Sequence, residues 1–482
     1  MPLWKIAWRS IQRRCLASIL TALSMGLGVM LVVIVLLIHG VVAESFRNNA
    51  SLGYNLIMGA KGGRLQLVLN TVFYLSEPVE NIPYAFYEDF LSADQRVDGK
   101  DGKWKDYVDR VIPVCLGDYY EQYRVVGTIP EMFEDYVYDE DTGEKYEFAE
   151  GRNFEYFNDE HGFFEAIVGA RVAADTGLKI GDTIVASHGS SEGKKHPDQF
   201  FVVGILAPSG TPNDRAVFVN MEGFYLLDGH AKPVDNESGG QRQMTKEEFE
   251  AAVAAASSQQ LNAEEETRPA HEVKTTPLPV EQREVTALLV KTSPIITRGL
   301  SNTINEGNQA QAVFPVGEIT ALFNRIVTPF QRLLLCLTAM ICIVSGISIL
   351  VSIYNSMNDR KREIAIMRSL GAGRRAVMAI VLLEAVLLAL GGGLLGWAGG
   401  HFMIVGASPW IEAETGVTIG LLDAAPGVNI MEFIAPNSNR SLRISSEWIL
   451  IPGLIILAII VGFLPALAAY KTDVAEALSA NP

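Results

Sequence analysis

Residues 358–377 read NDRKREIAIMRSLGAGRRAV, and residues 382–400 read LLEAVLLALGGGLLGWAGG. The first stretch is rich in arginine and carries apolar residues at helical spacing, which predicts a short amphipathic helix ending at Gly371. The second belongs to a 36-residue run, 376–411, in which Glu384 is the only charged side chain. A helix that crosses a bilayer needs about 20 such residues. The two stretches therefore predict a helix beside a membrane that leads directly into a membrane span.

Three further apolar runs are long enough to span a membrane. Residues 15–43, 333–358 and 448–470 contain 29, 26 and 23 residues without Asp, Glu, Lys or Arg. A signal peptide is the alternative for the first run, but its apolar region is typically about 7–15 residues long. An uncleaved anchor is therefore expected. Four spans exclude a soluble protein and a disordered one.

Basic residues gather on one side of these spans. Four precede the first span, and six lie between the second and third, whereas the segment between the third and fourth has two basic and five acidic residues. The positive-inside rule then places both termini and 358–375 in the cytoplasm, and 44–332 and 408–447 outside. The expected location is the cytoplasmic (inner) membrane, crossed four times.

The N-terminal residues LWKIAWRSIQRR separate apolar from basic side chains when they are drawn as a helix. This pattern predicts an amphipathic helix on the inner membrane surface. A basic flank that only sets the topology is the alternative.

The long central segment is an acidic, water-soluble body. Residues 44–332 carry 26 basic and 45 acidic residues, which argues against nucleic acid as a partner. Short β-rich runs and one short helix predict a mixed α/β domain. The runs are 166–170, 182–187, 200–206, 216–220 and 285–291, with the helix at 171–177. Residues 228–284 have one aromatic residue and many Glu, Gln, Ser and Ala, which predicts a flexible hydrophilic insertion.

The sequence offers no catalytic constellation. Its seven histidines are scattered without ligand-like spacing, no serine lies in a GxSxG elbow, and the acidic residues fit a solvated surface. Tyr119, Tyr120 and Tyr123 form a cluster that fits packing at a strand edge better than a binding surface. We therefore expect no enzyme activity, no metal and no cofactor in this chain.

Two features of the third span concern packing within the membrane. Gly392, Gly396 and Gly400 repeat every four residues, so one helix face lacks side chains and allows another helix to approach closely. Glu384 is costly in lipid and must face protein or water. A hydrogen bond to a neighbouring helix is favoured over a proton relay, because the spans contain no second charge to continue the relay.

The short inner helix is the candidate for contact with a cytoplasmic partner. Its apolar residues, Ile364, Ile366, Met367 and Leu370, are expected to share one face, with basic residues such as Arg362 and Arg368 on the other and Glu363 at the apolar side. A helix of this kind fits a groove of a cytoplasmic protein and passes motion to the membrane. A basic loop that only sets the topology is the alternative.

These stretches resemble the FtsX/MacB-type ABC transporter permeases. The inner loop and the span with Glu and a glycine run are similar to the core of that family, and PALAAYKTDVAEAL at 465–478 resembles its closing motif. GARVAADTGLKIGDTI (169–184) and FFVVGILAPSGTPND (200–214) resemble strands of the MacB-type extracytoplasmic domain. Ala365, Ser369 and Val474 depart from the usual family residues.

The resemblance implies four transmembrane α-helices plus a mixed α/β extracytoplasmic domain of MacB type. It implies a dimer, either a homodimer or a heterodimer with a related permease, working with a cytoplasmic ABC ATPase that binds ATP-Mg. Residues Arg362–Gly371 would form the coupling helix. The chain has no GxxxxGK[ST] motif, so the ATPase is expected to be a separate polypeptide.

The implied function is coupling of ATP hydrolysis to movement of extracytoplasmic domains, for export or for lipoprotein and lipid handling at the cell envelope. A mechanotransmitting regulator of a cell-envelope enzyme, with an envelope partner protein, is one alternative. A membrane receptor or scaffold without an ATPase is another. The expected order of segments is cytoplasmic helix 1–15, span 16–43, extracytoplasmic domain 44–325, span 326–357, coupling loop 358–375, span 376–407, outer loop 408–447, span 448–470 and cytoplasmic tail 471–482.

Overall fold

The computed structural model describes residues 2–139, 142–190, 192–230, 276–415, 417–429 and 443–471. The chain divides into two compact units, a helical unit of Met1–Asn48 with Ile319–Pro482 and a sheet unit of Asn49–Glu318. Most of the insertion expected at 228–284, and nearly all of the tail expected at 471–482, lie outside the described residues.

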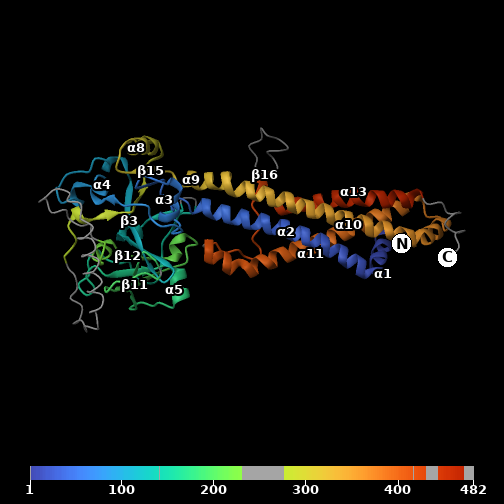
Figure 1. Ribbon diagram of the computed structural model, residues 1–482, viewed down its shortest axis with the longest axis horizontal. Helices are drawn as coiled ribbons and strands as arrows, with labels where there is room; N and C mark the ends of the chain where they lie inside the picture. Colours follow the sequence, from blue (N-terminus) through green and yellow to red (C-terminus); the bar gives the residue numbers. More distant parts are fainter. Residues whose placement is uncertain are drawn as a thin grey trace, which may run out of the picture. The chain divides into compact units, whose positions relative to one another are not determined.

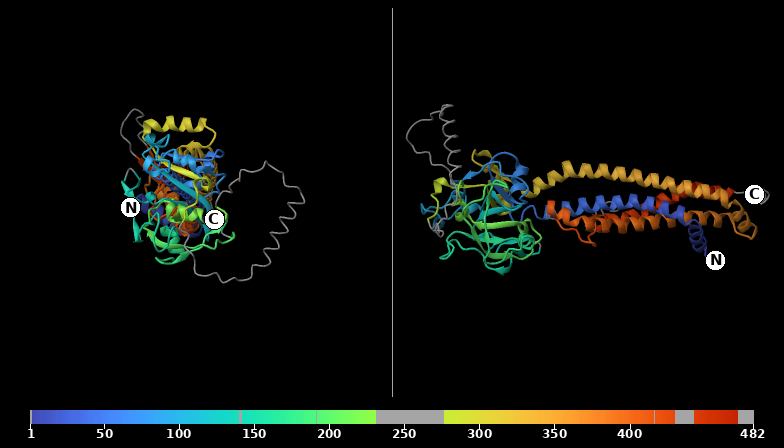
Figure 2. Two further views of the ribbon diagram at one scale, coloured as in Figure 1. Left: turned by 90° about the vertical axis from the view of Figure 1, so that its left-hand side faces the viewer. Right: turned by 60° about the horizontal axis from the view of Figure 1, so that its bottom comes forward.

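The helical unit is built on four long helices that run side by side (Figures 1 and 2). They are α2 (Cys15–Asn48), α10 (Thr328–Ser369), α11 (Arg374–Thr415) and α13 (Leu450–Lys471). Within the described residues, four apolar helical stretches are long enough to cross a membrane: Cys15–Asn48, Pro315–Asn355, Arg374–Glu412 and Ser446–Lys471.

Shorter elements complete this unit. α1 (Leu3–Arg13) precedes α2, and β16 (Gly427–Asn429) pairs with β17 (Arg443–Ser445). A π-helical segment (Phe323–Val327) precedes α10, and before it comes α9 (Pro315–Leu322), in which the boundary between the two units falls.

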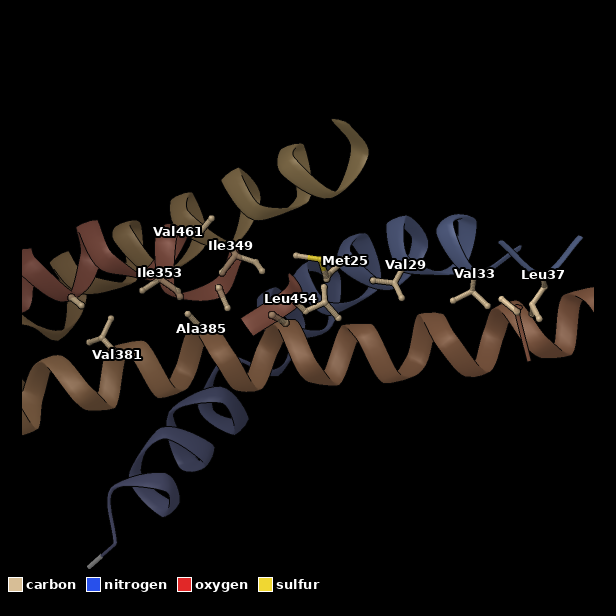
Figure 3. Close-up of a cluster of buried hydrophobic side chains, with 14 of the residues drawn as sticks. Met25, Val29, Val33, Leu37, Ile349, Ile353, Val381, Ala385, Leu454 and Val461 are labelled. Atoms are coloured by element: carbon tan, nitrogen blue, oxygen red, sulfur yellow. The ribbon is translucent and has the colours of Figure 1, made fainter. Parts of the chain in front are cut away.

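Apolar side chains at helical spacing form the core between the four helices (Figure 3). Met25, Val29 and Val33 recur every four residues on α2, so they line one face of that helix. They pack among side chains of the other three helices, including Ile349 of α10 and Leu454 of α13. Large apolar side chains on the outer faces are exposed, as expected for helices surrounded by lipid.

The inner loop is not the separate short helix that the sequence predicts at 358–375. Instead, α10 continues without a break to Ser369, and only residues 370–373 separate it from α11. No Gly or Pro occurs between Gly346 and Gly371, so nothing in the sequence stops the helix earlier. α11 also extends to Thr415, beyond the expected end at 407, with Pro409 inside it.

The sheet unit contains an eleven-stranded mixed sheet within its described residues. Nine strands form the main order β15-β1-β14-β3-β4-β12-β8-β11-β7, while β10 pairs with β3 and β9 with β11. The pairs β12–β4 and β11–β8 are parallel and the other pairs are antiparallel. The bounds are β1 Leu56–Gly59, β3 Arg110–Tyr120, β4 Tyr123–Thr128, β7 Phe148–Gly151, β8 Glu165–Val168, β9 Thr183–Ile184, β10 Ser187–His188, β11 Phe200–Leu206, β12 Ala216–Asn220, β14 Ala287–Lys291 and β15 Gln311–Val313.

Short helices pack against this sheet. α6 lies against β4, α8 against β15 and α5 against β11. Their bounds, with those of the other helices, are α3 Arg64–Thr71, α4 Tyr84–Glu88, α5 Ala170–Thr176, α6 Met221–Tyr225 and α8 Pro294–Glu306. Two small pairs, β2 (Ile82–Pro83) with β13 (Glu284–Val285) and β5 (Val137–Asp139) with β6 (Glu144–Lys145), lie outside the main sheet.

The predicted mixed α/β domain is confirmed, although the prediction lacked the β3–β4 hairpin. The strands expected at 200–206 and 216–220 coincide with β11 and β12, and the helix expected at 171–177 is α5. The run 182–187 is not one strand. It contains the short β9 and the first residue of β10, and residues 185–186 between them belong to neither strand. β3, which is the longest strand in the described residues, and its hairpin partner β4 were not predicted from the sequence.

Candidate functional site

The turn between α10 and α11 is the first candidate site. α10 ends before Gly371, whose φ of +97° places it in the left-handed region where glycine is favoured. The backbone N–H of Ala372 donates to the carbonyl of Met367 over 3.0 Å, and that of Gly371 donates to Arg368 over 3.1 Å. These bonds satisfy the last carbonyls of α10 and fix a tight reversal of the chain.

The four apolar residues expected on one face near this turn are divided between two faces. Ile364 is buried in the core of the helical unit and Met367 is half-buried against it, whereas Ile366 and Leu370 are 45% and 83% exposed. With about 3.6 residues per turn, positions 364 and 366 point in nearly opposite directions. The expectation of a single apolar face is therefore wrong, and Ile366 with Leu370 forms the exposed pair.

The N-terminal helix meets the same end of the bundle. The Arg13 guanidinium lies 3.1 Å from the Glu363 carboxylate of α10, with both groups largely exposed. At the start of α11, the Arg374 guanidinium lies 5.8 Å from the centre of the Tyr470 ring of α13. α1, the α10–α11 turn and the end of α13 thus gather at one end of the helical unit, where Arg362 and Arg368 also lie in α10.

Glu384 is buried in the helical unit and has a hydrogen-bond donor on another helix. The Ser10 hydroxyl of α1 donates to Glu384 Oε2 over 3.0 Å. Ser10 and Ala7 are the buried residues of α1, while Trp4 and Trp8 are exposed. Glu384 therefore makes the hydrogen bond to a neighbouring helix that the sequence favoured over a proton relay. That neighbouring helix is α1.

The glycine repeat of α11 lies against α2. A Cβ added to Gly392 would lie 2.6 Å from the Ala22 carbonyl oxygen, and one added to Gly396 would collide with the Gly26 carbonyl. A Cβ on Gly400 would lie 3.0 Å from the Val33 side chain. At Gly392 and Gly396 the α2 backbone is therefore too close to accommodate a side chain, whereas at Gly400 the Val33 side chain would have to shift.

A second polar network, which was not predicted from the sequence, surrounds Glu447 in the helical unit. This buried carboxylate accepts hydrogen bonds from the Trp397 indole at 2.8 Å and from the backbone N–H of Ala425 at 2.7 Å, and it lies 3.0 Å from His401 Nε2. The network holds the segment around Ala425 and the N-terminal end of α13 against α11.

In the sheet unit, four side chains far apart in the sequence meet at one place. We call Asp118, His188, His196 and His230 the His/Asp cluster. Their nearest N and O atoms all lie within 4.8 Å of one another. Burial lowers the pKa of His196, since desolvation together with His230 and His188 outweighs the attraction of Asp118. Histidine imidazoles and carboxylates are groups that bind metal ions. The sequence alone gave no signal for this cluster, because the spacings fit no ligand motif.

Family models match both units. An FtsX-like permease C-terminal domain matches residues 335–474, and a MacB-like periplasmic core domain matches residues 18–270, which is more than half of the chain. The chain belongs to the FtsX/MacB-type ABC transporter permeases. This permease is accordingly a multi-pass membrane protein with a large extracytoplasmic domain.

Two curated relatives resemble a short part of the permease. An uncharacterized ABC transporter permease, YknZ of Bacillus subtilis, is 29% identical over 115 residues, or 23% of this chain and 27% of the relative. A macrolide export ATP-binding/permease protein, MacB of Rhodopirellula baltica, is 30% identical over 111 residues, or 23% of this chain and 16% of the relative. The matched segments thus span about a quarter and a sixth of these relatives.

Proposed function

We propose that this permease couples ATP hydrolysis by a separate cytoplasmic ABC ATPase to movement of its extracytoplasmic domain. The observation that carries the proposal is the exposed pair Ile366 and Leu370 beside the tight α10–α11 turn. Apolar side chains exposed to water at a helix end favour burial in a partner, and each gains about 1.5–3 kcal/mol when fully buried. The ATPase would bind ATP-Mg, and the permease itself would catalyse no reaction.

The orientation that this function requires has the α10–α11 turn and both termini in the cytoplasm. The excess of Lys and Arg before α2 and at 358–375 supports this orientation. The gathering of α1, the α10–α11 turn and the end of α13 at one end of the bundle also supports it, because these basic ends then share one side of the membrane.

The cargo class that we propose is a substrate exported, or a lipid or lipoprotein released, at the outer face of the membrane. One relative is named for macrolide export, and the acidic extracytoplasmic body offers a large water-exposed surface. We propose that the permease acts as a dimer, with itself or with a related permease.

The test replaces the exposed pair. In the Ile366→Asp/Leu370→Asp variant, two charges would have to be desolvated at the ATPase contact, so copurification of an ABC ATPase from membranes should fall at least about tenfold. The matched control is Leu422→Asp, since Leu422 is 89% exposed and lies outside α10 and α11. This control should retain the ATPase.

Two measurements, the amount of protein inserted in the membrane and its thermal unfolding, distinguish loss of coupling from misfolding. Both variants should insert into the membrane in wild-type amounts and show wild-type thermal unfolding, because the replaced side chains are exposed. Undiminished ATPase association of the double variant would contradict the coupling role and favour an ATPase-independent receptor.

A further inference from the structure

The His/Asp cluster brings together three separate parts of the sheet unit. Asp118 lies on β3, His188 lies on β10 directly opposite Asp118 in the antiparallel register, and His196 follows on the chain that returns from β10. His230 comes after α6. Asp118 is fully buried, and the His196 and His230 side chains are 4% and 7% exposed, whereas His188 is 56% exposed.

Backbone hydrogen bonds and a ring contact position these residues. The His196 N–H donates to the Ala186 carbonyl over 2.9 Å, which closes the hairpin that carries both His188 and His196. A β-bulge between Leu116 and Asp118 interrupts the β3–β4 register at this point. The ring of His230 stands edge-on to Phe224 of α6, with ring centres 4.4 Å apart. The cluster therefore belongs to the fold and does not depend on mobile side chains alone.

The short contacts within the cluster lie at ion-pair distance but do not have hydrogen-bond geometry. Asp118 Oδ1 lies 3.2 Å from His188 Nδ1, and Asp118 Oδ2 lies 3.0 Å from His196 Nε2 and 3.2 Å from His230 Nε2. Even so, within the described residues, the two Asp118 oxygens and the Nε2 atoms of His196 and His230 make no hydrogen bond. Buried polar atoms that make no hydrogen bond are costly to the fold. The lone pairs of these oxygen and nitrogen atoms point to a shared metal cation as their ligand.

The geometry matches a small ion at the centre. The three imidazole ring centres are 5.1, 5.3 and 5.6 Å apart, and the ring planes cross at 63–84°. With Zn–N bonds of about 2.0–2.1 Å, tetrahedral zinc places imidazole ring centres about 5 Å apart. The same bonds place neighbouring donor atoms about 3.4 Å apart, so small rotations bring the donors, now within 4.8 Å, onto the ion.

We propose that the His/Asp cluster binds one zinc ion in the extracytoplasmic domain. Three imidazoles and one carboxylate supply four protein ligands, which is the closed coordination of a structural site. The imidazole-rich set also suits zinc over Mg²⁺ or Ca²⁺, which prefer oxygen ligands. The ion would tie β3, the β10 hairpin and the chain after α6 together.

The surroundings give the ion a route from solvent. A cavity of about 580 Å³ is lined by His188, His230, Gly189 and Arg124, and His188 reaches the surface. The Arg124 guanidinium in the cavity wall lies 4.2 Å from the centre of the Tyr119 ring, and its positive charge interacts with the Asp118 carboxylate.

The test uses the full chain in detergent, purified without a polyhistidine tag and stripped with a chelator. One Zn²⁺ per chain should bind, measured by elemental analysis after dialysis, and should raise the midpoint of thermal unfolding. Co²⁺ should give the intense visible absorption of a tetrahedral site. In His188→Gln and His196→Gln, zinc affinity should fall at least about 100-fold. Mutating a residue that only hydrogen-bonds to a metal ligand already lowers metal affinity about 10–100-fold.

The matched control is His161→Gln, which removes a half-buried histidine of the same unit that lies outside the cluster. Because His188 is exposed, its variant should fold normally, so its loss of zinc cannot be attributed to unfolding. The proposal would be overturned if wild-type protein bound no zinc, or if the cluster variants bound zinc as tightly as His161→Gln does. The cluster would then be a group of polar side chains that binds no metal.

Discussion

The Ser10 hydroxyl donates a hydrogen bond to Glu384 Oε2 across 3.0 Å, although 374 positions separate these two residues in the chain. The bond joins the N-terminal helix α1 to the third span, α11, at a buried position. Arg13 and Glu363 add an exposed ion pair between α1 and α10, which contributes little because water screens it. The N-terminal helix is therefore attached to the helices on both sides of the α10–α11 turn.

Removal of this hydroxyl should weaken the helical unit. Ser10→Ala leaves the Glu384 carboxylate without that donor, at an expected cost of about 0.5–2 kcal/mol for a hydrogen bond between membrane helices. Thermal unfolding in detergent measures the effect. Ser369→Ala is the control, because the Ser369 hydroxyl is exposed and bonds only to the Ile366 carbonyl of its own helix in the described contacts. Equal midpoints for the two variants would show that the Ser10 bond is not stabilising.

The glycine repeat predicts a different effect at two positions of one helix. Gly396→Leu would drive a side chain into the Gly26 carbonyl and separate α2 from α11, so the variant should insert but unfold at lower temperature. Gly391→Leu is the matched control, because a Cβ there meets no atom of the described chain within 4 Å. Wild-type stability of Gly396→Leu would mean that the two helices do not pack at this position.

The buried Glu165 carboxylate, paired with the partly exposed Arg152, should make the stability of the sheet unit depend on pH. Burial alone would raise the pKa of Glu165, but hydrogen bonds from the Arg152 side chain and the Glu155 N–H outweigh it and lower that pKa below 4.5. A carboxyl with a lowered pKa stabilises the fold above the pKa of the unfolded chain. That stability is lost as the pH falls through the folded pKa.

The measurement compares unfolding midpoints of wild type and Glu165→Gln between about pH 7 and pH 3. The wild-type advantage should be full above pH 4.5 and should shrink as the solution becomes more acidic. A constant difference over this range would show that the Arg152 pair does not hold the charge of Glu165.

The sequence pattern was sufficient to predict those helices and strands that depend on residues close together in the chain. The spans follow from uninterrupted apolar runs, and β11 and β12 follow from their short β-rich runs. The helix extension to Ser369 was also readable, since no breaker precedes Gly371. The strand β3 was missed because its alternation is blurred by Pro113 and Gly117.

Relationships between distant residues had no local signal. The serine that meets Glu384 and the helix that meets Gly396 depend on which helices become neighbours. The His/Asp cluster depends on the register of β10 with β3 and on the chain path after α6. Such juxtapositions are set by tertiary packing and leave no fixed spacing in the sequence.

The orientation in the membrane yields the last prediction. Single cysteines are placed at Thr142 and Ser369, both exposed, in a chain whose four native cysteines are replaced. A thiol reagent that cannot cross the membrane should label Thr142→Cys in intact cells, because this residue belongs to the extracytoplasmic domain. It should label Ser369→Cys only after the membrane is opened, because the proposed orientation keeps the basic α10–α11 turn in the cytoplasm. Labelling of opened membranes is the control for thiol reactivity at both positions. Equal labelling of the two variants in intact cells would reverse the orientation of the turn and remove its access to a cytoplasmic ATPase.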